Sequence, residues 1–310
     1  MVEYITRRQD ILSRMKKIMG DLPLHSDNHP IAKEIINTEV IGNVIRQRIR
    51  YSDEPESFIP AYLMIPVKID KPVPGIICLH QTTQCGSKEP AGVEGKPNLF
   101  YAIELAQRGY ITLAPDLPSF GDLKNVNPLP EGYVSGTMKD INLHCRGLDL
   151  LSETDGVDAQ RLACIGHSLG GHNALFLAAF DSRVKVAATS CGFTTWEAYA
   201  ENAGDLSAWA QDRYMPRIRD IYHNNPSEMP VLFEEILGAI LPGAIYINAP
   251  VKDAGMPKKG VDVCVDYIRK ISNETGLPLN LLVEHPDCGH DFPAEQRENC
   301  YNFIDKQLKN

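Results

Sequence analysis

The sequence predicts an α/β fold in which helices cover both faces of a mostly parallel central sheet. From residue 75 onward, short apolar segments alternate with amphipathic segments of helical spacing, and no Gly-, Ser- or Pro-rich stretch is long enough to link two domains. Apolar strands that alternate with helices are typical of parallel sheets buried on both sides. We therefore expect a single domain over residues 1–310.

The N-terminal part predicts a helix and then a pair of antiparallel strands. Residues 4–19 carry apolar side chains at mostly helical spacing, and Gly20 ends this pattern. Val44–Tyr51 and Ile59–Pro66 alternate apolar and polar residues on either side of a polar turn at 52–57. This alternation and the turn between the segments are typical of a β-hairpin.

The remainder of the chain predicts the parallel sheet and its helices. Residues 193–242 interrupt the alternation with aromatic and acidic residues, so we expect an inserted helical cap there. After this cap, we expect two further strands and a closing helix. The segments that carry the alternation are 75–80, 99–107, 110–114, 138–152, 162–166, 172–180, 184–189, 244–249, 279–284 and 293–308.

Composition narrows the classes of partner. The net charge of −9 disfavours nucleic acid, and no apolar stretch approaches the roughly 20 residues that cross a bilayer. The N-terminus lacks the pattern of a signal peptide and the eight cysteines are scattered, so we expect a cytoplasmic protein with mostly reduced thiols. The amphipathic first helix makes a homo-oligomer a reasonable expectation.

The strongest motif is Gly166-His-Ser168-Leu-Gly170, which follows an apolar strand and precedes a helix. A GxSxG sequence between a strand and a helix is typical of the sharp nucleophile turn of α/β-hydrolases. The flanking glycines avoid collisions in such a turn, which exposes the serine hydroxyl at the carboxyl edge of the sheet. We therefore expect Ser168 to be a catalytic nucleophile.

A serine nucleophile needs a base, and that base needs an orienting carboxylate. In this fold the acid and then the histidine follow the serine along the chain. Four histidines lie downstream of Ser168. We favour His290, which lies on a loop just after the last strand. Of the other three, His172 is on the nucleophile helix and His223 precedes the strand expected to carry the acid. His285 is at a strand end.

The expected acid is Asp253, a few residues beyond the strand at 244–249. Asp262 and Asp266 fall in or near the next helix, where carboxylates usually form a solvated face. Asp287 lies on the same short loop as His290.

An oxyanion hole in this fold uses two backbone amides, one after the nucleophile and one after an early strand. The first is predicted to be the amide of Leu169. The second should come from the residues that follow the strand ending near Leu79, with Thr82 slightly favoured over Gln81.

Five segments resemble the dienelactone hydrolase-like and acetyl xylan esterase-like branch of the α/β-hydrolases, over roughly residues 60–308. This resemblance implies hydrolysis of carboxylic esters without a metal or an organic cofactor. Dienelactone hydrolases proper have cysteine where this chain has Ser168, and the usual His-Gly after the early strand is His80-Gln81 here. The segments are Leu79–Thr82, Ala114–Asp116, Gly166–Gly171, Ala249–Asp253 and Gly289–Pro293.

The favoured function is therefore hydrolysis of a small-molecule ester by a Ser-His-Asp triad. An oligopeptidase or aminopeptidase, a thioester-cleaving enzyme and a non-catalytic binding module are the alternatives. A zinc site formed by His285, Cys288, His290 and Asp291 is disfavoured, because ligands within one short segment leave the coordination shell incomplete.

Overall fold

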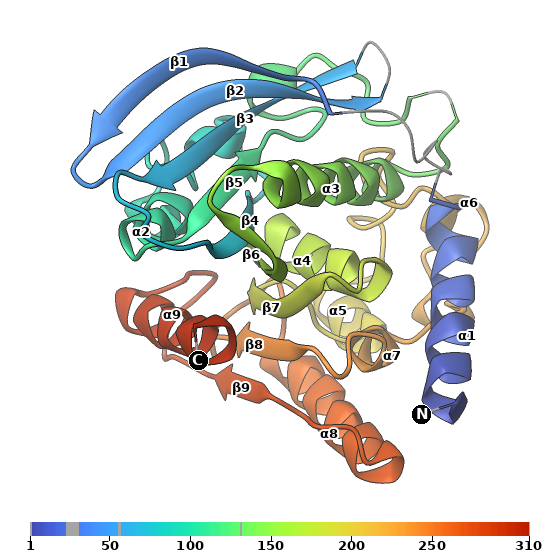
Figure 1. Ribbon diagram of the computed structural model, residues 1–310. Coiled ribbons are helices and arrows are strands. Elements are labelled where there is room, and N and C mark those ends of the chain that lie inside the picture. The colour runs from blue at the N-terminus through green and yellow to red at the C-terminus, as the bar shows by residue number, and fades with distance from the viewer. Residues whose placement is uncertain (1, 23–30, 55–56, 131, 310) are drawn as a thin grey trace.

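The computed structural model describes residues 2–22, 31–54, 57–130 and 132–309. Within these residues, nine strands form one twisted sheet (Figure 1). Their bounds are β1 (Lys33–Ile41), β2 (Val44–Glu54), β3 (Ser57–Pro66), β4 (Val73–Leu79), β5 (Ile111–Pro115), β6 (Val157–His167), β7 (Val184–Ser190), β8 (Ala244–Asn248) and β9 (Leu281–Glu284). Their order across the sheet is β1-β2-β3-β5-β4-β6-β7-β8-β9.

The first part of the sheet is antiparallel. Strands β2 and β3 pair as the predicted hairpin, with Val44 opposite Pro66 and Tyr51 opposite Ile59. Residues 55–56 of the expected turn lie outside the described residues. The sequence interpretation missed β1, which pairs with β2 alone and is exposed along nearly its whole length. An edge strand with both faces in water carries no apolar stripe to reveal it.

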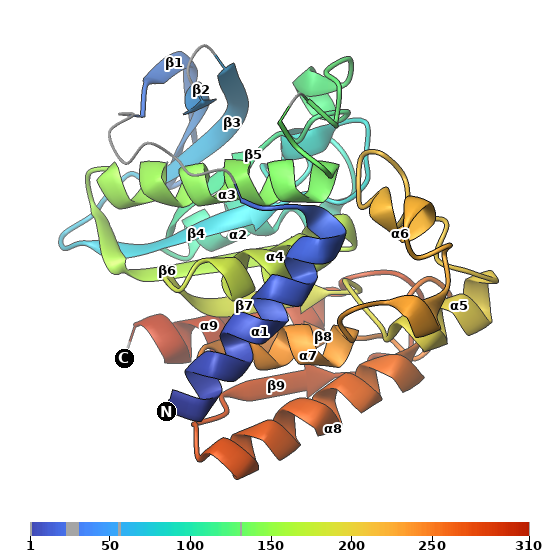
Figure 2. The same cartoon turned by 90° about the vertical axis from the view of Figure 1, so that its right-hand side faces the viewer.

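From β5 to β9 the sheet is parallel, as predicted, and helices cover both of its faces (Figures 1 and 2). Helices α2 and α9 pack on one face, and α3 and α4 lie on the other. The helices are α1 (Val2–Met19), α2 (Tyr101–Gln107), α3 (Gly136–Glu153), α4 (Leu169–Phe180), α5 (Trp196–Ala203), α6 (Arg217–Asp220), α7 (Phe233–Gly238), α8 (Lys258–Thr275) and α9 (Ala294–Leu308).

Several helices start about two residues from the predicted position, and α2 and α4 are examples. Helix α2 begins at Tyr101 because Pro97–Leu99, at the start of the expected segment, forms a separate 3₁₀ turn. Helix α4 begins at Leu169, directly after the serine of the GxSxG motif, rather than near Gly171. In both cases the local apolar spacing is correct, and the boundary moves by about half a turn.

Helix α1 buries its apolar stripe within its own chain. Ile11, Met15 and Ile18 are buried in the main core, and Arg14 forms a bidentate ion pair with Glu235 of α7, with N–O distances of 2.6 and 2.8 Å. The amphipathic character of this helix is therefore explained by intramolecular packing, and it no longer argues for a second copy.

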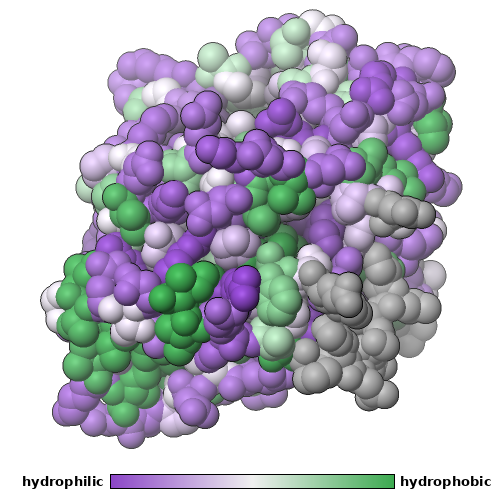
Figure 3. Space-filling model, turned by 90° about the horizontal axis from the view of Figure 1, so that it is seen from above, coloured by the Kyte–Doolittle hydropathy of each residue, from purple (hydrophilic) through white to green (hydrophobic). Residues whose placement is uncertain are grey.

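The expected cap segment carries α5, α6 and α7. Helix α6 lies beyond the end of α1, and α7 packs beside α1 and α4 (Figure 2). Viewed from the β1 end, the surface is mostly hydrophilic with separate hydrophobic patches (Figure 3). None of the helices in the described part of the chain combines the length and the apolarity that a membrane span requires.

Candidate active site

Ser168 occupies the turn between β6 and α4 in a backbone conformation that only a constrained residue adopts. Its φ is 55° and its ψ is −118°, a combination that costs a non-glycine residue about 1–3 kcal/mol. The turn is held because the Ser168 amide donates to the Ser190 carbonyl at 2.8 Å, while the Ser168 carbonyl accepts from Gly171 at 2.9 Å. The fold therefore maintains the strained serine that the motif predicts.

Close packing explains both glycines of the motif. A Cβ atom on Gly170 would lie 2.0 Å from the Leu79 carbonyl oxygen, and one on Gly166 would lie 2.2 Å from the Gly170 backbone. Backbone atoms cannot give way as a flexible side chain can, so larger residues would push the serine turn away from β4. The same close contact brings the start of α4 next to the loop after β4.

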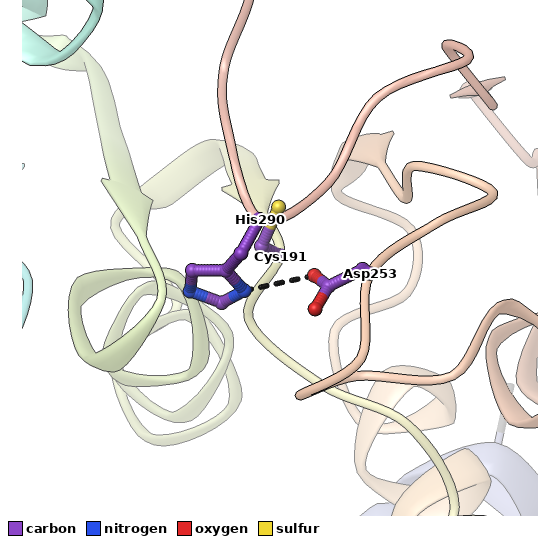
Figure 4. A group of neighbouring side chains, drawn as sticks. All are labelled: Cys191, Asp253 and His290. Carbon is purple, nitrogen blue, oxygen red and sulfur yellow. Dashed lines mark hydrogen bonds and ion pairs between the residues drawn. The ribbon is translucent and has the colours of Figure 1, made fainter.

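His290 and Asp253 come together from loops that follow β9 and β8, as predicted. The His290 Nδ1 atom lies 2.9 Å from the Asp253 Oδ2 atom (Figure 4). The other oxygen, Oδ1, accepts from the amides of Gly255 at 2.8 Å and Met256 at 3.1 Å. Burial alone would raise the pKa of Asp253, but the hydrogen bonds from His290 and the two amides leave that pKa below its ordinary value.

This arrangement fixes the protonation of the imidazole. Because Asp253 is ionised and can only accept, His290 Nδ1 carries the hydrogen that it donates. In the neutral ring, the lone pair is then on Nε2. A histidine in this state can take a proton from a hydroxyl group placed at Nε2.

The other carboxylates considered from the sequence have different partners. Asp262 lies 3.3 Å from the Nε2 atom of His285, and Asp287 is exposed and pairs with Lys252 at 2.8 Å. Asp266 is an exposed partner of Arg269 on α8. Among these carboxylates, Asp253 is the one that contacts His290.

The His290 ring also lies against the residue that precedes the serine. The ring centroids of His290 and His167 are 4.8 Å apart in an edge-to-face arrangement. The pKa of His167 is lowered to about 3, mainly by burial and to a smaller extent by the neighbouring His290. His167 is therefore neutral near pH 7. Its Nδ1 atom lies 3.0 Å from the Ser190 hydroxyl. Ser168 and His290 are thus brought to the same edge of the sheet.

A buried network that the sequence did not reveal anchors the His290 loop. The Asn248 side chain, at the end of β8, donates to the Ser190 hydroxyl at 2.8 Å and to the Asp291 carbonyl at 3.0 Å. The Cys191 thiol contacts the same carbonyl at 3.5 Å. Cys191 follows β7 and Asn248 ends β8, so the two residues reach the same carbonyl because these strands are neighbours in the sheet.

The residues considered from the sequence as zinc ligands are not the group of ligand-type side chains that the fold brings together. His285 donates from Nδ1 to the Ala249 carbonyl at 2.7 Å. In the described part of the chain, ligand-type atoms within 4.8 Å of one another come instead from Cys191, Asp253 and His290 (Figure 4). Burial raises the pKa of the Cys191 thiol far above its ordinary value, which disfavours the thiolate that a metal would need.

The loop after β4 is oriented by buried His80. The Leu117 amide donates to His80 Nε2 at 3.2 Å, so the ring hydrogen is on Nδ1, which donates to the Gln81 carbonyl at 2.7 Å. The peptide bond from Gln81 to Thr82 is trans, so the Thr82 N–H points away from the carbonyl that His80 holds. The direction of the Thr82 N–H is therefore tied to the hydrogen bond between His80 and the Gln81 carbonyl.

Ser168, Leu169 and Thr82 line one pocket of about 210 Å³. Four of its ten lining residues carry aromatic rings, and most of the lining comes from α4, α5 and the segment after α5. Thr82 and Tyr214 join the two sides of the pocket through hydroxyl groups 3.0 Å apart. The remaining lining residues are His172, Tyr199, Ala208, Trp209, Gln211 and Met256. Two of the aromatic residues expected in the cap, Trp209 and Tyr214, thus border the serine.

Comparison with known families defines the class of protein. A family model described as the alpha/beta hydrolase family matches residues 97–302, which include Ser168, Asp253 and His290. The chain therefore belongs to the alpha/beta hydrolase family.

A sequence relative and several solved structures match this chain over nearly its full length. The chain is 28% identical over 312 residues to the Bacillus subtilis (strain 168) protein named "Putative hydrolase YtaP", with 97% of this chain and all of that protein covered. Two carbohydrate esterases have the same fold. A glucuronoyl esterase from Solibacter usitatus has a TM-score of 0.74 at 17% identity, covering 97% of this chain and 92% of its own. An acetyl xylan esterase from Paenibacillus sp. R4 has a TM-score of 0.66 at 18% identity, covering 98% and 94%.

Proposed function

We propose that this α/β-hydrolase cleaves carboxylic esters through an acyl-enzyme intermediate on Ser168. The observation that carries the proposal is the hydrogen bond of 2.9 Å between His290 and Asp253, with the His290 ring against His167, which directly precedes the serine of the strained turn. His290 takes the hydroxyl proton as the Ser168 oxygen attacks the ester carbonyl. The protonated histidine then gives this proton to the leaving alcohol, and water releases the acid by the same route.

In this proposal the amides of Leu169 and Thr82 stabilise the negative charge on the carbonyl oxygen. Both residues line the pocket that contains Ser168, and Leu169 is the first residue of α4. The dipole of this helix also favours negative charge at its N-terminus. The likeness of the fold to that of carbohydrate esterases supports an ester as the substrate.

A panel of substrates tests the type of bond that is cleaved. We expect p-nitrophenyl acetate and an acetylated sugar to be hydrolysed, with activity falling as the acyl chain outgrows the pocket of about 210 Å³. An aminoacyl p-nitroanilide and an acyl thioester should be poorer substrates. Preferential hydrolysis of the anilide would favour the peptidase alternative, and preferential cleavage of the thioester would favour a thioesterase. The measurement is kcat/KM for each compound.

His80 is a positioning residue whose replacement tests the proposed oxyanion hole. In His80→Phe the Gln81 carbonyl loses its donor, so the Thr82 amide is no longer held toward the pocket. We expect kcat to fall by about 10- to 100-fold with little change in KM. In His80→Gln, the side-chain amide can still donate, so part of kcat should return. Equal kcat values in wild type and His80→Phe, with both folded by circular dichroism, would contradict this role.

A further inference from the structure

A second and larger cleft adjoins the serine pocket at Thr82. It has a volume of about 960 Å³ and is formed by the loops that follow β4 and β5, together with Arg213. Thr82 lines both spaces, and Arg213 directly precedes Tyr214, whose hydroxyl group lies 3.0 Å from the Thr82 hydroxyl. A substrate attached to Ser168 can therefore extend past Thr82 into this cleft.

Two cations in this cleft have no anionic partner among the described residues. Asp122, on the cleft wall, already contacts Arg48 at 2.6 Å and Lys88 at 3.3 Å. Within the same described ranges, neither Arg213 nor Lys124 forms an ion pair, although both line the cleft. The guanidinium of Arg213 lies over the ring of Phe120, 5.6 Å from its centroid.

This local charge contrasts with the whole protein, whose net charge is −9. Acidic residues are abundant elsewhere, yet in the part of the chain that the structure describes these two side chains line the cleft without a salt bridge. Glu94 also lines the cleft and, among the described residues, forms no ion pair, so the three cations and two carboxylates of the lining leave one positive charge in excess. A guanidinium and an ammonium that line the same cleft suit an anionic group such as a carboxylate.

The order of strands indicates which part of an ester would reach the cleft. Ser168 follows β6, the cleft is built on β4 and β5 to one side, and Asp253 and His290 follow β8 and β9 on the other side. The leaving alcohol must lie toward His290 to receive its proton. The carbonyl oxygen faces the Leu169 and Thr82 amides, and the acyl chain lies on the side of Ser168 away from His290, where Thr82 borders both the pocket and the cleft.

We propose that the natural substrate is an ester whose acyl part carries an anionic group, bound in this cleft by Arg213 and Lys124. The inference rests on the proposed ester hydrolysis and names the substrate class for the same site. Both cations are partly or fully open to water, so salt should weaken the interaction.

The test compares two esters that differ in charge. For the p-nitrophenyl monoester of adipic acid, kcat/KM at low salt should be about 10-fold higher than for p-nitrophenyl hexanoate, after subtraction of the enzyme-free rates. In Arg213→Gln and in the double variant with Lys124→Gln, the ratio should fall toward one, mainly through KM for the adipate ester. Addition of 0.5 M NaCl, roughly three times the ionic strength at which the Debye length is 8 Å, should also reduce this ratio.

A matched control and a third ester make the outcomes distinct. Arg219→Gln removes an exposed arginine that pairs with Asp212 and Asp220 outside the cleft, and the ratio should stay as in wild type. Equal kcat/KM for both esters in wild type, or an advantage only for 4-acetoxybenzoate, whose charge is on the alcohol side, would overturn the inference. If wild type turned over no ester at all, the proposed function itself would fail.

Discussion

Replacement of Ser168 by alanine is expected to lower kcat for an activated ester by about 10⁴- to 10⁶-fold. The hydroxyl is the group that would form the acyl-enzyme, and the methyl side chain of alanine offers no nucleophile in its place. The turn itself should persist, since it is held by backbone hydrogen bonds and by the close packing of Gly166 and Gly170. Steady-state hydrolysis of p-nitrophenyl acetate measures the effect.

A second serine variant separates loss of the nucleophile from a general effect of mutation. Ser182 is exposed in the turn that follows the far end of α4, and Ser182→Ala should retain wild-type turnover. Circular dichroism and thermal unfolding should be nearly the same for all three proteins. Turnover in the Ser168 variant within tenfold of wild type would mean that another residue performs the reaction.

Asp253→Asn should lower kcat by about 10⁴-fold while leaving the geometry of the site nearly intact. The carboxylate accepts from His290 Nδ1 at 2.9 Å and so keeps the lone pair on Nε2. An asparagine amide can instead donate to Nδ1, which places the ring hydrogen on Nε2 and removes the base. The lowered pKa of Asp253, set by burial and by its hydrogen bonds, keeps the wild-type carboxylate ionised well below neutral pH.

The control for this variant is Asp287→Asn, on the same loop as His290. Asp287 is exposed and pairs with Lys252, so its replacement should change kcat by less than about threefold. A large loss in Asp287→Asn together with a small loss in Asp253→Asn would reverse the assignment of the acid. The kcat of each variant should be measured from pH 5 to 9, because an altered tautomer lowers the whole profile.

The elements that carry the site were predictable because their signals are local. The strand, the GxSxG turn and the following helix lie within about 25 residues. The glycines of the motif are required because a Cβ atom added to Gly170 would lie only 2.0 Å from a backbone oxygen. The order of acid and histidine along the chain then selected Asp253 and His290, which the fold brings within hydrogen-bonding distance.

Other features depend on contacts between distant segments and leave no local pattern. Strand β1 is exposed on both faces, so no periodicity marks it. The role of His80 depends on the direction of one peptide group, which follows from its bonds to Gln81 and Leu117. Arg213 lies in the segment where the sequence predicted a helical cap, but its place in the second cleft depends on the folded loops after β4 and β5.

The most direct test of the central claim is covalent labelling with a fluorophosphonate, followed by peptide mass mapping. Such a reagent reacts with a serine that is activated by a histidine and mimics the tetrahedral intermediate. We expect one adduct per chain, on the peptide that contains Ser168, and much slower labelling in Asp253→Asn. Stoichiometric labelling at another residue, or full ester turnover while Ser168 remains unmodified, would contradict the account.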